Sequence, residues 1–246
     1  MANPPLVNLA TLKKDYYQFV VYGRGGVGKT DFGLRSTPNP IEWIDADQRA
    51  NTITEKFNDG RIAHLYQPNS QGELENSIAH AIYNLQDVFV RTGKKGTIVL
   101  DSYTAAKNLV SMDYLVRQNR PVDAKFSIED RSNVKRTMLR IINNLKFSQF
   151  NLVATAEQGI KIIGEENSTK IAAIQGDVPK HEDDLMYFCD YLLHLYPLDV
   201  KIDGTNQIVT KYYWKLYKSS TSRIPQEMLL KAKEDIEWAA VIIEIE

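Results

Sequence analysis

The stretch that decides the fold of this chain is Gly23-Arg24-Gly25-Gly26-Val27-Gly28-Lys29-Thr30. It matches the pattern G-x-x-x-x-G-K-[ST], in which the outer glycines, the lysine and the hydroxyl residue are fixed. The apolar run at 17–22 precedes it and is typical of a strand. A short helical pattern follows and must end near Pro38. Strand, glycine loop and helix are the context in which this motif binds phosphates.

The chemistry of the motif predicts the role of each position. Glycines let the backbone curl so that its N–H groups point at phosphate oxygens, and the helix that follows offers further N–H donors. Lys29 is expected to reach the outer phosphates and Thr30 to bind Mg²⁺ through its hydroxyl. The predicted nucleotide-binding residues are Gly23, Arg24, Gly25, Gly26, Val27, Gly28, Lys29, Thr30 and Asp31.

Composition excludes several classes of protein. The chain has 246 residues, enough for one α/β domain, and a net charge of -1, so it has no chain-wide attraction to nucleic acid. Its one cysteine, Cys189, rules out an intrachain disulfide and a cysteine zinc cluster. The sequence has no apolar run of about 20 residues and no signal-peptide pattern at its start. We therefore expect a cytoplasmic protein that has no membrane partner.

Apolar runs and helical periodicity alternate along the chain, which favours a mainly parallel sheet covered by helices on both faces. A protruding hairpin is expected over 159–180, and an antiparallel hairpin at one sheet edge near the C-terminus. The division we predict is a leader at 1–15, one α/β domain at 16–225, and a helix and tail at 226–246. Strands are expected at 17–22, 41–45, 62–66, 97–101, 151–156, 191–196, 199–202 and 207–217. Helices are expected at 49–57, 73–90, 103–118, 128–145 and 181–188.

Acidic residues at strand ends are candidates for the metal and for catalysis. Asp101 closes the run 97–101 and is expected to share Mg²⁺ with Thr30. Many ATPases carry the catalytic acid directly after this aspartate, but here Ser102 stands there. The base must then come from another strand, and Asp47 is our choice. Asp45 is the alternative base, and helix capping is the alternative role for Asp47.

Further polar groups are expected near the phosphates. Glu157 and Gln158 end the strand 151–156 and are predicted to sense the γ-phosphate and signal to the hairpin, or else to be a plain polar strand end. Lys218 and Arg223 are candidates for a cationic finger that crosses a subunit boundary, or else a solvated basic loop. One helix carries a basic face that is either solvated or binds DNA, made of Arg131, Lys135, Arg136 and Arg140.

With these residues placed, the chain resembles the RecA-like P-loop ATPases. More narrowly, it is similar to small phage nucleotide-binding ATPases, including the Sak-type single-strand annealing and recombination proteins. The resemblance rests on GRGGVGKT, IEWIDAD, TIVLDS and NLVATAEQ over residues 17–158, with LYKSSTSR as a weaker match. RecA-like enzymes carry their catalytic acid after the second strand, at the position of Asp47, but usually as Glu. The small phage relatives often have His where Glu157 stands, and Arg24 is unusual in the loop.

The resemblance implies a RecA-like fold, ATP and Mg²⁺ as cofactors, and ATP hydrolysis linked to single-stranded DNA in viral recombination, annealing or replication. It also implies self-association into an oligomer or filament, a single-strand binding or replication protein as a further partner, and the host cytoplasm as location. Its DNA-binding loops correspond to 119–127 and 159–180, neither of which is strongly basic. Two alternatives stay open: a nucleotide or small-molecule kinase with a lid at 131–140, and a non-catalytic nucleotide-dependent protein adaptor.

Overall fold

The computed structural model describes residues 15–53, 59–164, 171–179, 189–201, 208–219 and 230–232. Its helices are α1 (Lys29–Arg35), α2 (Ala50–Ile53), α3 (Gln71–Thr92), α4 (Tyr103–Arg117) and α5 (Ile128–Phe147). Its strands are β1 (Gln18–Gly23), β2 (Ile41–Asp45), β3 (Ile62–Tyr66), β4 (Thr97–Asp101), β5 (Asn151–Gly164), β6 (Ile171–Pro179), β7 (Tyr191–Lys201), β8 (Ile208–Ser219) and β9 (Leu230–Ala232). Within these ranges, no helix is both long and apolar enough to cross a membrane.

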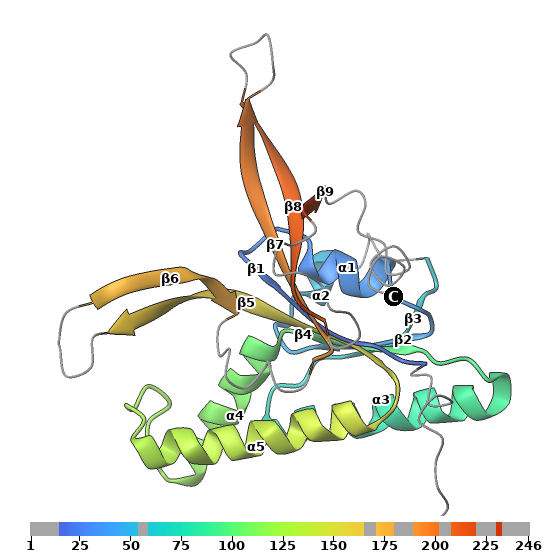
Figure 1. Ribbon diagram of the computed structural model, residues 1–246. Coiled ribbons are helices and arrows are strands. Elements are labelled where there is room, and N and C mark those ends of the chain that lie inside the picture. Colours follow the sequence, from blue (N-terminus) through green and yellow to red (C-terminus); the bar gives the residue numbers. More distant parts are fainter. Residues whose placement is uncertain are drawn as a thin grey trace, which may run out of the picture.

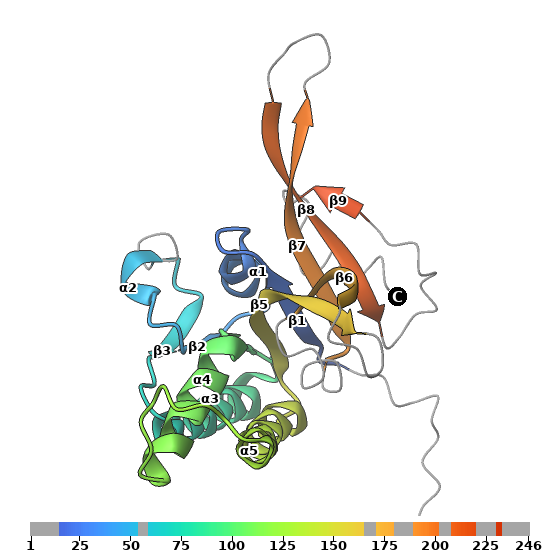
Figure 2. The same ribbon diagram turned by 90° about the vertical axis from the view of Figure 1, so that its left-hand side faces the viewer.

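The strands join in one sheet of order β3-β2-β4-β5-β1-β7-β8-β9, and β6 pairs with β5 outside this path. All neighbours from β3 to β7 run parallel, whereas β8, β9 and β6 are antiparallel to their partners. The predicted mainly parallel sheet with an antiparallel hairpin at one edge is therefore confirmed. Both hairpins, β5–β6 and β7–β8, project beyond the body of the sheet (Figures 1 and 2).

Helices cover both faces of the sheet (Figure 1), because the central strands are apolar on both sides. Ile98 and Leu100 of β4 face one core, which α3, α4 and α5 close with residues such as Leu74 and Ile142. Val99 of the same strand faces the other core, where Phe32 of α1 packs. The central strands are thus buried between two hydrophobic cores. This packing fixes the positions of the strand ends that carry the candidate site residues.

The register brings the ends of β1, β2 and β4 to the same edge of the sheet, beside the middle of β5 and β7. Gly23 at the end of β1 lies opposite Glu157 on β5 and Leu195 on β7. Asp45 at the end of β2 lies opposite Asp101 at the end of β4. In parallel α/β sheets, ligands bind at these carboxyl ends, at the point where the strand order switches direction. Here β1 is that point, since the chain continues to β2 on one side and returns as β7 on the other.

The structure corrects the expected element boundaries. The hairpin 159–180 forms, but its first half is a continuation of the strand 151–156, so β5 is longer than predicted. The two strands expected at 191–196 and 199–202 are one strand, β7. Pro197 is tolerated there because β1 pairs with β7 only as far as Leu195, so the missing N–H is not needed on that side.

The last part of the chain also differs from expectation. Leu230–Ala232 form a strand against β8, although a helix was predicted over 226–246. The short helix predicted at 181–188 lies outside the described residues, as do 54–58, so only Ala50–Ile53 of the helix 49–57 can be compared. The division into a leader, a main domain and a tail stays a prediction.

Candidate nucleotide-binding site

The loop after β1 has the shape that its glycines allow. Gly28 adopts φ 96° and ψ 23° directly before α1, a left-handed conformation that strains residues with a side chain. At Gly23, an added Cβ would lie 2.2 Å from the backbone oxygen of Leu195, so only glycine fits between β1 and β7. Val27 is buried in the core that α1 covers and does not line the cavity, although it was predicted with the other residues of the loop.

Lys29 lies at the mouth of the loop. Its Nζ donates to the backbone oxygens of Gly23 at 3.0 Å and Arg24 at 2.8 Å. Burial lowers the pKa of this ammonium, and the carboxylates of Asp101 and Glu157 oppose that shift. The lysine is therefore a partly desolvated cation, which is well suited to pair with a phosphate group.

The two predicted metal ligands are in direct contact. Thr30 Oγ1 donates to Asp101 Oδ2 at 2.7 Å, and the Thr155 hydroxyl donates to the other carboxylate oxygen, Oδ1. Asp101 is buried, and burial raises its pKa although both hydroxyls oppose the shift. Mg²⁺ prefers hard oxygen ligands and is commonly held by one carboxylate, a hydroxyl and substrate phosphates. The residues present therefore fit a magnesium ion between loop and sheet.

Asp47 lies beside this pair, one turn beyond β2. Its backbone N–H donates to the Asp101 carbonyl at 3.2 Å, and its Oδ1 accepts from Ser102 Oγ at 3.1 Å. The side chain is 20% exposed, and burial raises its pKa above the ordinary value. A carboxylate with a raised pKa at the rim of a site is suited to accept a proton.

Asp45, the alternative base, has a structural role instead. It is fully buried, and its Oδ2 accepts from the Ala50 backbone N–H at 2.7 Å and from Gln67 Nε2 at 3.0 Å. The first bond holds the start of α2, which is the capping role considered for Asp47. The two aspartates thus differ in position: the side chain of Asp45 binds the backbone at the start of α2, and Asp47 lines the cavity.

One cavity of about 470 Å³ collects the predicted residues, a volume typical of small-molecule sites. Its walls come from the loop and the start of α1, the turn after β2, the end of β4 and the middle of β5. The lining residues are Gly23, Arg24, Gly25, Gly26, Gly28, Lys29, Thr30, Asp31, Asp47, Arg49, Asp101, Ser102, Glu157 and Gln158.

Comparison with known proteins agrees with this geometry. A family model described as an AAA domain (AAA_24) matches residues 15–218. The chain belongs to this AAA domain family. Together with the loop and the sheet order, this establishes a domain of the P-loop ATPase type with a mainly parallel sheet.

A search of curated proteins with the sequence of this chain found no match. Among solved structures, this chain is similar to the crystal structure of a KaiC-like protein from the hyperthermophilic archaeon Pyrococcus horikoshii OT3. The identity is 14%, the match covers 88% of this chain and 84% of that chain, and the TM-score is 0.44.

Gln158, in the middle of β5, links the cavity to β7. Gln158 Oε1 lies 3.3 Å from Nε2 of His194, which is 4% exposed and stacks on the Tyr22 ring at 4.4 Å between centroids. Glu157 is exposed at the cavity rim. Sequence reasoning missed His194, for which a polar ring within an otherwise apolar strand was the available signal. It also missed Arg49, a cation two residues after Asp47.

The backbone of Lys218, one of the two predicted finger residues, lies away from the loop of its own chain. Lys218 lies inside β8 and pairs with Leu192, which is level with Val20 on β1. Gly23 is level with Leu195, so Lys218 stands toward the opposite end of the sheet from the loop. Arg223 lies outside the described residues. A finger role for Lys218 would therefore require a neighbouring chain, and the finger roles of both residues stay predictions.

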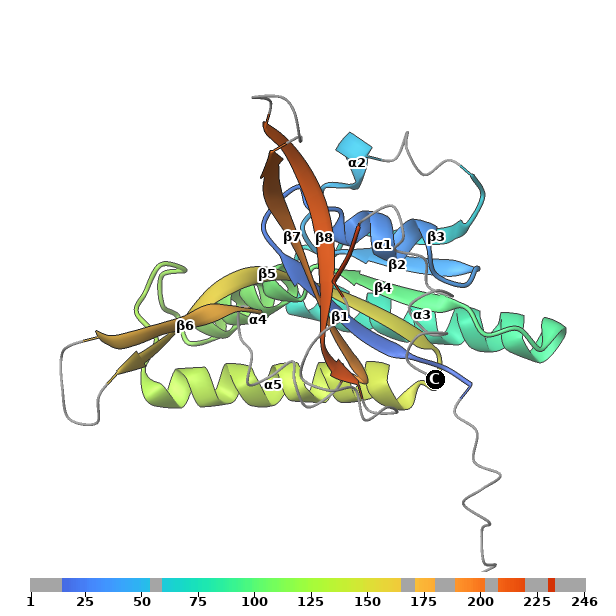
Figure 3. The same ribbon diagram turned by 45° about the horizontal axis from the view of Figure 1, so that its top comes forward.

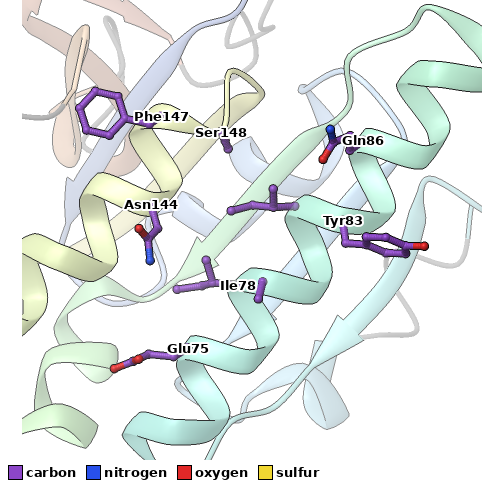
Figure 4. Close-up of a pocket in the computed structure, with 9 residues that line it drawn as sticks. Glu75, Ile78, Tyr83, Gln86, Asn144, Phe147 and Ser148 are labelled. Atoms are coloured by element: carbon purple, nitrogen blue, oxygen red, sulfur yellow. The ribbon is translucent and has the colours of Figure 1, made fainter.

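A second cavity of about 490 Å³ lies between α3 and α5 (Figure 4). It is lined mainly by apolar and amide side chains, such as Ile78 and Asn144, and contains none of the predicted site residues. Glu75 at its edge pairs at 2.6 Å with Arg140, one of the four residues of the predicted basic face on α5. Because this cavity has no glycine loop and no metal-binding pair, the loop cavity is the candidate site.

Proposed function

We propose that this AAA domain hydrolyses ATP with Mg²⁺ and couples the hydrolysis to single-stranded DNA in viral recombination, annealing or replication. The observation that carries the ATPase part is the convergence of Lys29, Thr30, Asp101 and Asp47 on one cavity. These groups match the parts that phosphoryl transfer needs: a phosphate cradle, a metal site and a group that positions water.

Each group has a role that follows from its contacts. Lys29 leaves the loop carbonyls to pair with the outer phosphates, since an ammonium binds phosphate more strongly than it binds a neutral carbonyl. Thr30 and Asp101 would hold Mg²⁺, which neutralises charge on the phosphates. Asp47, held by Ser102, accepts the proton of the attacking water.

The DNA part of the proposal is supported by the position of the hairpin β5–β6. Gln158 lines the cavity, and the same strand continues directly into this hairpin. The hairpin, the loop at 119–127 and the start of α5 lie on the same side of the molecule (Figures 1 and 3). Exposed cations at that end of α5 are Arg131, Lys135 and Arg136. Local contacts of this kind suit a chain whose net charge is only -1.

We also propose self-association, with ATP between subunits and Lys218 or Arg223 of a neighbour as the finger. The register of β8 supports a role between chains rather than within one, because it carries Lys218 away from its own loop. A single-strand binding or replication protein remains a proposed further partner, and the cytoplasm of a host cell the proposed location.

The test is the rate of phosphate release with and without single-stranded DNA at two salt concentrations. We expect stimulation by DNA that weakens with salt, since phosphate contacts release counterions. Lys29→Ala should abolish turnover while the thermal unfolding curve stays cooperative. Replacing Arg131, Lys135 and Arg136 by Gln should reduce the stimulation, whereas replacing the exposed Lys94, which follows α3, should not.

Other outcomes would favour the alternatives. ATP consumption that depends on an added nucleoside or nucleotide and ignores DNA would indicate a kinase. Tight ATP binding with no turnover, with or without DNA, would indicate an adaptor. Normal turnover by Lys29→Ala would contradict the site itself.

A further inference from the structure

Arg49 lines the nucleotide cavity but has no part in the roles above. Its Nε lies 3.9 Å from Oδ2 of Asp47, and its side chain is 66% exposed whereas that of Asp47 is 20% exposed. The other oxygen of Asp47 is held by Ser102. Arg49 can therefore change partner without disturbing buried packing, while Asp47 stays where it is.

The turn that carries both residues is held at several points. Asp47 N–H donates to the Asp101 carbonyl at 3.2 Å, and Gln48 N–H donates to the Asp45 carbonyl at 3.3 Å. Gln48 adopts φ 55°, a left-handed conformation, and directs its Nε2 to the Pro68 carbonyl at 3.3 Å. The turn thus places Asp47 and Arg49 on the same rim of the cavity and Gln48 away from it.

The carboxylate of Asp47 and the terminal phosphate of a bound nucleotide would compete for the guanidinium of Arg49. In this structure the guanidinium lies beside the carboxylate of Asp47. A terminal phosphate carries more negative charge and presents several oxygens, which the planar guanidinium binds in bidentate fashion. A diphosphate lacks this group, so its binding leaves Arg49 with Asp47.

We propose that Arg49 exchanges Asp47 for the terminal phosphate of a bound nucleoside triphosphate. The exchange makes Arg49 the residue that distinguishes triphosphate from diphosphate, and it leaves Asp47 to the attacking water only when a triphosphate is present. The inference rests on the proposed ATPase function and adds a residue that reports which nucleotide is bound.

The test is equilibrium binding, by calorimetry, of ADP and of a non-hydrolysable ATP analogue, both with Mg²⁺. For Arg49→Gln we expect the affinity for the analogue to fall about tenfold or more, the size typical of a charge-assisted hydrogen bond, and that for ADP to change less than about twofold. Arg49→Lys should recover part of the loss. The matched control is Arg35→Gln, because Arg35 also pairs with an aspartate at 3.9 Å and is 54% exposed but does not line the cavity.

A double-mutant cycle tests the exchange itself. Asp47→Asn should tighten binding of the analogue, because the competing carboxylate is gone, and should do so only when Arg49 is present. An equal loss for both nucleotides in Arg49→Gln, no loss for either, or tightening by Asp47→Asn that persists without Arg49 would overturn the proposal. Lys29→Ala separates the nucleotide-site assignment from the exchange proposed for Arg49. If Lys29→Ala binds both nucleotides as tightly as the wild type, the site assignment is wrong. If Lys29→Ala loses nucleotide binding but the Arg49 variants bind like the wild type, only the exchange is contradicted.

Discussion

Asp47→Asn is the substitution that tests the catalytic assignment most directly. The amide keeps the shape of the carboxylate, and its oxygen can still accept the Ser102 hydroxyl bond of 3.1 Å, so the turn after β2 should be undisturbed. What is lost is the ability to take a proton. General base catalysis contributes about 10² to 10⁴ in rate. At about 1.36 kcal/mol for each factor of ten, this is a rise of about 2.7 to 5.4 kcal/mol in the activation barrier.

The assay is phosphate release at saturating Mg²⁺ and ATP, together with nucleotide affinity measured separately. We expect kcat to fall by the amount above while the nucleotide still binds, because Lys29, Thr30 and Asp101 are untouched. Glu157→Gln is the comparison: this exposed carboxylate on β5 also lines the cavity but is predicted to sense the γ-phosphate rather than to take a proton, so its loss should cost less than about tenfold. Turnover of Asp47→Asn within about threefold of the wild type would refute the assignment, and a large loss in Glu157→Gln would move the base to β5.

Three further predictions follow from single contacts. Asp45→Ala should lower the free energy of unfolding in urea by about 1–3 kcal/mol, because two hydrogen bonds lose their buried acceptor. Gly23→Ala should lower the melting temperature and abolish nucleotide binding, since its Cβ would lie 2.2 Å from the Leu195 oxygen, whereas Gly25→Ala, with open space, should keep the melting temperature. Turnover should fall as the pH drops through the pKa of Asp47, because the protonated acid cannot accept a proton. Burial raises this pKa above the ordinary 3.8. The residual rate of Asp47→Asn should lack the fall at low pH that Asp47 causes.

The local parts of the site were predictable from sequence because they are encoded within a few residues. The loop 23–30 is recognisable by glycines at fixed spacing, and Asp101 by the three apolar residues that precede it. Strand 97–101 and the helix around 73–90 were also read correctly, since a run buried on both faces and an amphipathic period are local patterns. The long hairpin strands were not, because the pairing that extends β5 and β7 depends on residues far away in sequence.

By itself, the sequence determined a glycine loop of the phosphate-binding type on a mainly parallel sheet, because the motif and the strand periodicity are local properties of the chain. Only the tertiary structure separated Asp45 from Asp47, two residues apart, into a buried cap and a group at the cavity rim. It also brought Gln158 to His194 and set Arg49 beside Asp47. These choices depend on strand order and on how a turn is anchored by distant carbonyls, and no local pattern of residues records either.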